Sequence, residues 1–181
     1  MSRPPHAREK VLDAFEQLLI DEGARAATMD ATARAAGVSK GGLLYHFGSK
    51  DALEKGLIAR AEALVADDLA AMSAAPDGPV AYFLRTSALA GDPLDRALVA
   101  TSRIAQGGSA QARAALDRTR EGWADALRPH VAGAAELDLV LLVADGLYAN
   151  YTQSEDAATG RVPTGAAMDA LIALVERATR A

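Results

Sequence analysis

Two lysines, two ring-bearing side chains and two adjacent glycines lie close together between residues 40 and 50 of this sequence. The six residues are Lys40, Gly41, Gly42, Tyr45, His46 and Lys50. Lysine side chains neutralise the phosphates of nucleic acids, which is the chemistry that such a cluster could perform. A glycine inside a helix costs about 1 kcal/mol relative to alanine. Two glycines occur here where the neighbouring pattern favours a helix, so a function that needs them is expected.

The surrounding residues predict three helices that would position this cluster. Residues 7–22 have apolar side chains on one helical face and predict the first helix. Thr28 is a good N-cap for a second, short helix, and Ser39 can cap the third. Only Gly37, Val38 and Ser39 join the two short helices, which is the sequence form of a helix-turn-helix motif. Glycines on such a recognition helix would let its backbone approach DNA closely.

The composition predicts a helical protein throughout. Half of the residues are hydrophobic, only 4% are aromatic, and alanine is abundant. A long helix is expected from Lys50 to Met72, followed by further helices near residues 80–90, 94–106, 109–129, 135–154 and 164–180. We therefore expect an all-α fold with a helix-turn-helix domain over residues 1–55 and a helical domain over residues 56–181.

Charge is distributed unevenly along the chain. The formal net charge is −5, but residues 1–60 carry 9 Lys and Arg against 8 Asp and Glu, whereas residues 61–181 carry 10 against 16. A locally basic head on an acidic body is compatible with binding a polyanion at one end. The absence of cysteine excludes disulfides and thiolate metal sites. Short apolar runs and a charged N-terminal segment favour a cytoplasmic protein without a membrane span.

The stretch TMDATARAAGVSKGGLLYHFGSKDAL, residues 28–53, resembles the DNA-binding domain of the tetracycline-repressor (TetR) family. The resemblance extends over residues 8–56 and rests on the Thr28 cap, the turn through Ser39 and the basic positions that follow. It implies an all-helical fold in which a small helix-turn-helix domain is joined to a larger domain that binds a small molecule and dimerises. Two residues depart from the family pattern: Leu44 replaces a frequent tyrosine, and Thr32 replaces Ile or Val.

The same resemblance implies that the third helix lies in the major groove of DNA. Thr28 and Lys50 would meet phosphates, and Leu44 could pack on a thymine methyl group. The complete set of candidate DNA-contact residues is Thr28, Ser39, Lys40, Gly41, Gly42, Leu44, Tyr45, His46 and Lys50. The alternatives are that the lysines are simply solvated and that Tyr45 and His46 are partly buried structural residues.

The second domain offers less specific signals. By family analogy some of its large or polar residues would line a pocket for a small-molecule effector, and the candidates are Tyr82, Phe83, Arg103, Trp123, Tyr148, Asn150 and Tyr151. Each could instead belong to the core or to a dimer surface. Residues 137–151 and 168–178 are the segments expected at a homodimer interface, with Met168, Leu171, Ile172 and Val175 on one face of the latter.

These features favour a ligand-responsive regulator, a repressor that binds an inverted-repeat operator as a homodimer and is released by a small-molecule effector. The identity of the effector, and whether it releases or promotes DNA binding, stay open. A helical protein-interaction adaptor that has lost DNA binding is the alternative. An enzyme is disfavoured because the three histidines, His6, His46 and His130, have no metal-ligand spacing, so we expect no catalytic residue, cofactor or metal.

Overall fold

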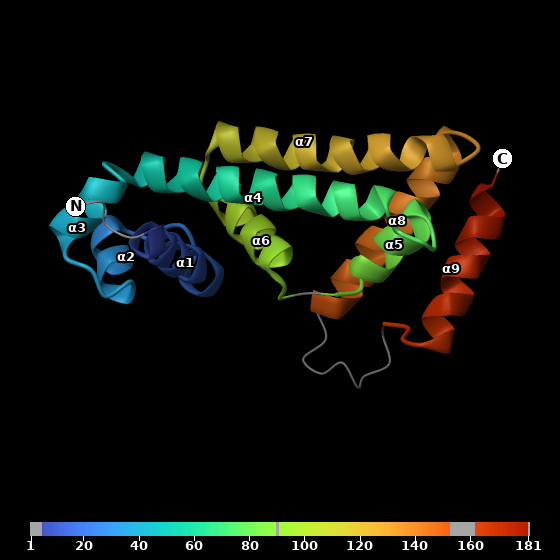
Figure 1. Cartoon of the computed structure of the whole chain (residues 1–181), viewed down its shortest axis with the longest axis horizontal. Coiled ribbons are helices and arrows are strands. Elements are labelled where there is room, and N and C mark those ends of the chain that lie inside the picture. The colour runs from blue at the N-terminus through green and yellow to red at the C-terminus, as the bar shows by residue number, and fades with distance from the viewer. Residues whose placement is uncertain (1–4, 90, 153–161, 181) are drawn as a thin grey trace. The chain divides into compact units, whose positions relative to one another are not determined.

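The described residues of the computed structural model, 5–89, 91–152 and 162–180, form nine α-helices and no strand (Figure 1). Their bounds are α1 Pro5–Glu22, α2 Met29–Ala35, α3 Lys40–His46, α4 Lys50–Ser73, α5 Pro79–Thr86, α6 Pro93–Gln106, α7 Ala110–Leu127, α8 Ala134–Thr152 and α9 Ala166–Thr179. A short 3-10 turn, Arg128–His130, follows α7. The all-α fold class expected from the sequence is confirmed. The end of the helix expected over residues 135–154 lies outside the described residues.

By its internal contacts the chain divides into two compact units. The first unit comprises Met1–Val65 and Pro93–Arg118, and the second comprises Ala66–Asp92 and Thr119–Ala181. Both α4 and α7 therefore contribute residues to each unit. The functional boundary expected between residues 55 and 56 stays a prediction.

The core of the first unit joins the helix-turn-helix to α1, α4 and α6. Phe15 of α1, Leu43 of α3 and Leu57 of α4 are fully buried in it. At Gly56 the backbone of α4 approaches α1 and the end of α3 closely. A Cβ atom there would lie 2.9 Å from Cε1 of Phe47 and 3.2 Å from Cδ2 of Leu12. This glycine is therefore required by packing, because real Cβ atoms do not approach carbon that closely.

The core of the second unit is built by α5, α8 and α9 together with parts of α4 and α7. Leu84, Leu127 and Val140 are fully buried there. Met168, Ile172 and Val175 are buried in the same core, since α9 packs against α5 and α8 of its own chain. This apolar face of α9, which the sequence placed at a dimer interface, is thus covered within the chain.

Candidate nucleic-acid interface

Side-chain caps define both short helices of the helix-turn-helix motif. The Thr28 hydroxyl accepts a hydrogen bond from the backbone N–H of Ala31 at 3.2 Å, at the start of α2. The Ser39 hydroxyl accepts one from the N–H of Gly42 at 3.0 Å, at the start of α3. Between them the chain turns at Gly37, whose φ of +65° is a left-handed conformation that favours glycine. The local residues therefore build the motif that the sequence predicted.

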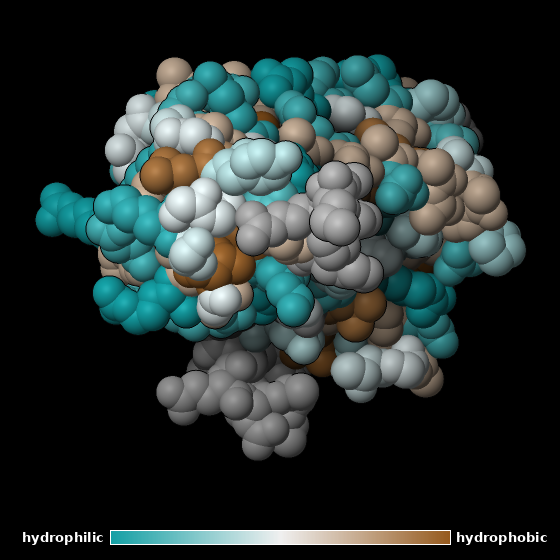
Figure 2. Space-filling view, turned by 60° about the vertical axis from the view of Figure 1, so that its left-hand side comes forward, coloured by the Kyte–Doolittle hydropathy of each residue, from teal (hydrophilic) through white to brown (hydrophobic). Residues whose placement is uncertain are grey.

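One face of α3 is buried and the opposite face is open. Leu43 and the following Phe47 point into the core, whereas Leu44 is 43% exposed and Tyr45 is 74% exposed. Lys40 and Gly41 are also exposed. Figure 2 shows a face on which hydrophobic residues form separate patches within a mostly hydrophilic surface. A tyrosine this exposed contributes little to the fold, so its ring is accessible to an external partner.

The two adjacent glycines of α3 have different surroundings. A Cβ atom on Gly42 would lie 3.2 Å from the Ser39 hydroxyl oxygen, so this glycine makes room for the cap. A Cβ atom on Gly41 would meet no atom within 4 Å. Packing within the chain therefore does not require a glycine at position 41. Close approach of an external partner would explain why the helix has a residue of such low helix propensity there.

The two candidate phosphate-binding lysines already have partners within the protein. The Nζ of Lys40 lies 2.9 Å from Oδ1 of Asp30, in the first turn of α2. The Nζ of Lys50 donates a hydrogen bond of 2.6 Å to the backbone carbonyl of Ala24, in the loop between α1 and α2. A lysine has three donors, so one partner leaves donors for a phosphate. Sequence reasoning identified both lysines but neither partner.

Ring contacts support the C-terminal end of α3. The rings of Tyr45 and His46 pack edge to face with centroids 5.2 Å apart. The guanidinium of Arg8, on α1, lies over the ring of Phe47 at 5.0 Å from its centroid, a cation–π contact. This contact connects α1 to the residue that ends α3.

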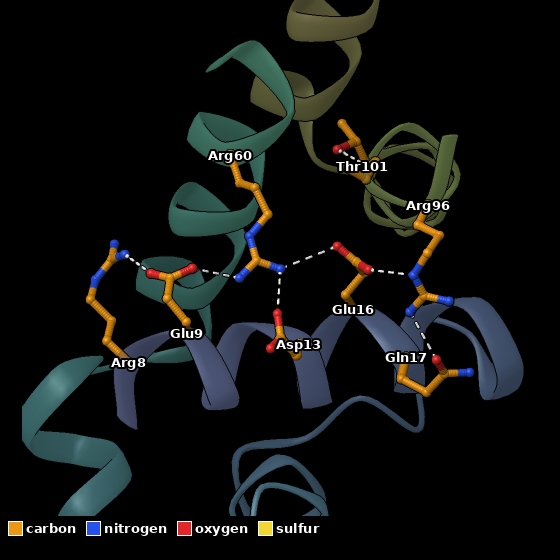
Figure 3. A network of polar contacts seen from close by, with 9 residues as sticks. Arg8, Glu9, Asp13, Glu16, Gln17, Arg60, Arg96 and Thr101 are labelled. Atoms are coloured by element: carbon orange, nitrogen blue, oxygen red, sulfur yellow. Dashed lines mark hydrogen bonds and ion pairs between the residues drawn. The ribbon is translucent and has the colours of Figure 1, made fainter. Parts of the chain in front are cut away.

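A network of charged side chains connects α1 to α4 and α6 behind this interface (Figure 3). Glu16 of α1 lies at its centre, with a side chain only 6% exposed. One of its oxygens is 3.0 Å from Nε of Arg96 on α6, and the other is 3.4 Å from a nitrogen of Arg60 on α4. Arg60 also pairs with Glu9 and Asp13. Sequence reasoning missed this network because Arg60 and Glu16 are 44 residues apart.

The aromatic candidates of the second unit meet at a carboxylate that sequence reasoning did not single out. Asp68 of α4 accepts a hydrogen bond of 2.9 Å from the Tyr82 hydroxyl and another of 2.9 Å from Nε1 of Trp123. The rings of Phe83 and Trp123 pack at 5.7 Å. Burial and the hydrogen bond to the charged Asp68 raise the pKa of Tyr82 to about 12. Three of the seven candidates are thus brought together.

The other four candidates are not part of this cluster. Arg103 is on α6, belongs to the first unit and hydrogen-bonds to Gln106. Tyr148, Asn150 and Tyr151 follow one another near the end of α8 in the second unit. The role of all seven in binding an effector stays a prediction.

The described residues contain neither a metal-ligand cluster nor a membrane-spanning helix. No three His, Asp or Glu side chains in this part of the chain gather as ligands for a metal ion. No helix of the described residues is long and apolar enough to cross a membrane. That the protein needs no metal or cofactor stays an expectation.

Comparison with known proteins identifies the N-terminal motif. Residues 11–55 match the family described as bacterial regulatory proteins, tetR family. This match covers the caps, the turn and the whole of α3, so it rests on the residues whose geometry is described above. No curated protein among those compared matches the chain.

Solved structures share the fold over nearly the whole chain. A TetR-like transcriptional regulator from Rhodococcus sp. RHA1 is 22% identical, with 98% of each chain covered and a TM-score of 0.63. GusR of Salmonella enterica is 18% identical over 97% of this chain and 96% of its own, with a TM-score of 0.66. The multidrug binding protein EbrR, solved in complex with imidazole, is 17% identical over 98% and 97%, with a TM-score of 0.58.

The matched family model covers the helix-turn-helix of the first unit, and the solved structures share the helical fold over nearly the whole chain. Residues 11–55 are thus similar to the helix-turn-helix part of tetR-family bacterial regulatory proteins. That the protein is not an enzyme stays an expectation.

Proposed function

We propose that the protein is a ligand-responsive repressor that binds an inverted-repeat operator as a homodimer. The observation that carries this proposal is the open face of α3, where Gly41, Leu44 and Tyr45 are exposed without a packing reason. These residues, with Gly42 and His46, would contact base edges or pass close to the DNA backbone in the major groove.

Phosphates would be bound at the edges of this face. Thr28 and Ser39 are exposed at the starts of α2 and α3, where backbone N–H groups and the helix dipole favour an anion. Lys40 is exposed, and Lys50 has donors left after its bond to Ala24. Phosphate contacts of this kind make affinity fall steeply as salt is raised.

A homodimer would present two such faces to two half-sites. Leu139 and Leu142 on α8 and Leu174 on α9 are exposed, with 66% of Leu142 accessible. Exposed leucines on neighbouring helices favour a protein partner, and a second copy of the chain pairs them across a two-fold axis. The half-sites would then be about one helical turn, ~35 Å, or somewhat more apart.

A small-molecule effector would bind in the second unit. The complex of EbrR with imidazole is an instance of ligand binding by a protein of this fold. Asp68, a residue of α4 that joins Tyr82 and Trp123, lies on the same continuous helix as Lys50. A ligand that displaced α4 would therefore act on a helix that begins with a phosphate-binding lysine. A coupling free energy of about 1–3 kcal/mol is typical of such switches.

The test is the selection of duplexes from a random pool by the purified protein, followed by binding of the enriched site at several salt concentrations. The double variant Lys40→Ala/His46→Ala is the control. We expect an enriched inverted repeat whose binding weakens with salt and is lost in the control variant. An intact dimer that enriches no sequence at low salt would contradict the proposal and favour the protein-interaction adaptor.

A further inference from the structure

We infer that Asp30 limits the affinity of this protein for DNA by competing with phosphates for the ammonium group of Lys40. The inference rests on the proposed DNA-binding function and assigns to it a residue outside the candidate contact set. Asp30 is a positioning residue in this scheme, since it acts on DNA through Lys40.

An ion pair connects the two short helices of the motif. Lys40 is the first residue of α3, and its Nζ lies 2.9 Å from Oδ1 of Asp30 in the first turn of α2. The side chains are 64% and 65% exposed, so a duplex can reach both. Asp30 also has a favourable position with respect to the dipole of α2, because a negatively charged side chain in the first turn of a helix is stabilising.

A carboxylate beside a phosphate-binding lysine has two consequences. Lys40 must leave Asp30, or share its donors between two anions, when a phosphate arrives. Each lysine that neutralises a phosphate releases a condensed counterion. It thereby steepens the slope of the logarithm of the binding constant against the logarithm of the salt concentration by about 0.9. A lysine already neutralised by Asp30 contributes less to both the affinity and this slope.

The experiment measures the dissociation constant of the enriched duplex over a salt series for the wild type and for Asp30→Asn. Asparagine retains the size of the side chain and an oxygen acceptor but carries no charge. We expect an affinity about two- to fivefold higher, the range that an exposed ion pair supports. The salt slope should steepen by up to about one.

Two further variants separate competition for Lys40 from other effects of the charge. In a Lys40→Gln background, measured at low salt, Asp30→Asn should have no effect on affinity, because the shared lysine is gone. Asp51→Asn removes a carboxylate from the first turn of α4 that is similarly exposed and paired with a lysine, Lys55, outside the candidate set. This matched variant should change DNA affinity little.

The following outcomes would contradict either the inference or the proposed function on which it rests. An unchanged or lower affinity of Asp30→Asn overturns the inference and leaves Asp30 as a structural residue of α2. A gain that persists in the Lys40→Gln background, or that Asp51→Asn reproduces, assigns the effect to general repulsion and also overturns it. If the wild type binds no duplex, the proposed function itself fails, together with the inference that depends on it.

Discussion

At the scale of single residues, a substitution of Gly41 should affect folding stability and DNA binding in opposite directions. Its Cβ position is open, so Gly41→Ala should increase the free energy of unfolding by up to about 1 kcal/mol. The same methyl group would face DNA and should lower operator affinity about tenfold, equal to ~1.4 kcal/mol. Urea unfolding and duplex titration measure the two effects.

Gly122→Ala is the matched control for this substitution. A Cβ atom there would meet Cδ1 of Leu69 at an ordinary 3.5 Å, so the variant should also gain stability. Its operator affinity should stay unchanged, since Gly122 is on α7. If Gly41→Ala bound the operator as tightly as the wild type, close approach of DNA at this glycine would be excluded.

Tyr82 provides a prediction on pH dependence. Its pKa is about 12 in the folded chain, compared with 10.0 for an unperturbed tyrosine. The folded state therefore holds the phenol proton more tightly, and the resulting stability is full below pH 10 and is lost as the pH rises toward 12. Absorbance titration of tyrosinate, as the difference between wild type and Tyr82→Phe, should show this late ionisation. In Asp68→Asn the ionisation of Tyr82 should move to lower pH, and an unchanged titration would contradict the role of Asp68.

At the scale of helices, the close approach of α4 to α1 and α3 at Gly56 predicts an effect opposite to that at Gly41. The added methyl group of Gly56→Ala would press on Phe47 and Leu12, both buried. Overpacking of a core costs about 1–3 kcal/mol, which exceeds the gain in helix propensity. We therefore expect a lower midpoint of urea unfolding. An increase in the midpoint would show that the ring of Phe47 can move aside.

Removing different carboxylates of the charged network around Glu16 should lower the free energy of unfolding by different amounts. Glu16→Gln removes the buried negative charge that Arg60 and Arg96 share. It should lower the free energy of unfolding by about 1.5–3 kcal/mol, as for hydrogen bonds to charged groups. Asp13→Asn removes an exposed partner of the same Arg60 and should cost less than about 1 kcal/mol. Equal losses in the two variants would argue that burial of Glu16 is unimportant.

Local patterns predicted the helices and the motif but not the pairs that connect them. The caps Thr28 and Ser39 and the turn at Gly37 act on residues within a few positions, so the sequence displays them directly. The partners of Lys50 and Trp123 are 26 and 55 residues away, and no periodicity encodes such distances. The apolar face of α9 was assigned to a partner subunit for the same reason. An apolar stripe predicts that a face is covered but does not specify by which helix.

At the scale of the whole molecule, the exposed leucines of α8 and α9 provide a test of the proposed homodimer. Leu142→Lys would place a charge on each side of a two-fold interface and should raise the dimer dissociation constant tenfold or more, about 1.4 kcal/mol. Sedimentation at several protein concentrations measures it. Leu89→Lys replaces a leucine of similar exposure, 57%, that is outside α8 and α9, and should leave self-association unchanged. An unaffected dimer in Leu142→Lys would remove α8 from the interface.

The position of Trp123 has a consequence for observing this molecule. It is the only tryptophan in the chain, and its indole N–H is bonded to Asp68 beside the ring of Phe83. Indole emission therefore originates entirely from the second unit, at the carboxylate that also binds Tyr82. The protein thus contains a native fluorophore whose spectrum reports the environment of that cluster, while the helix-turn-helix contributes no indole signal.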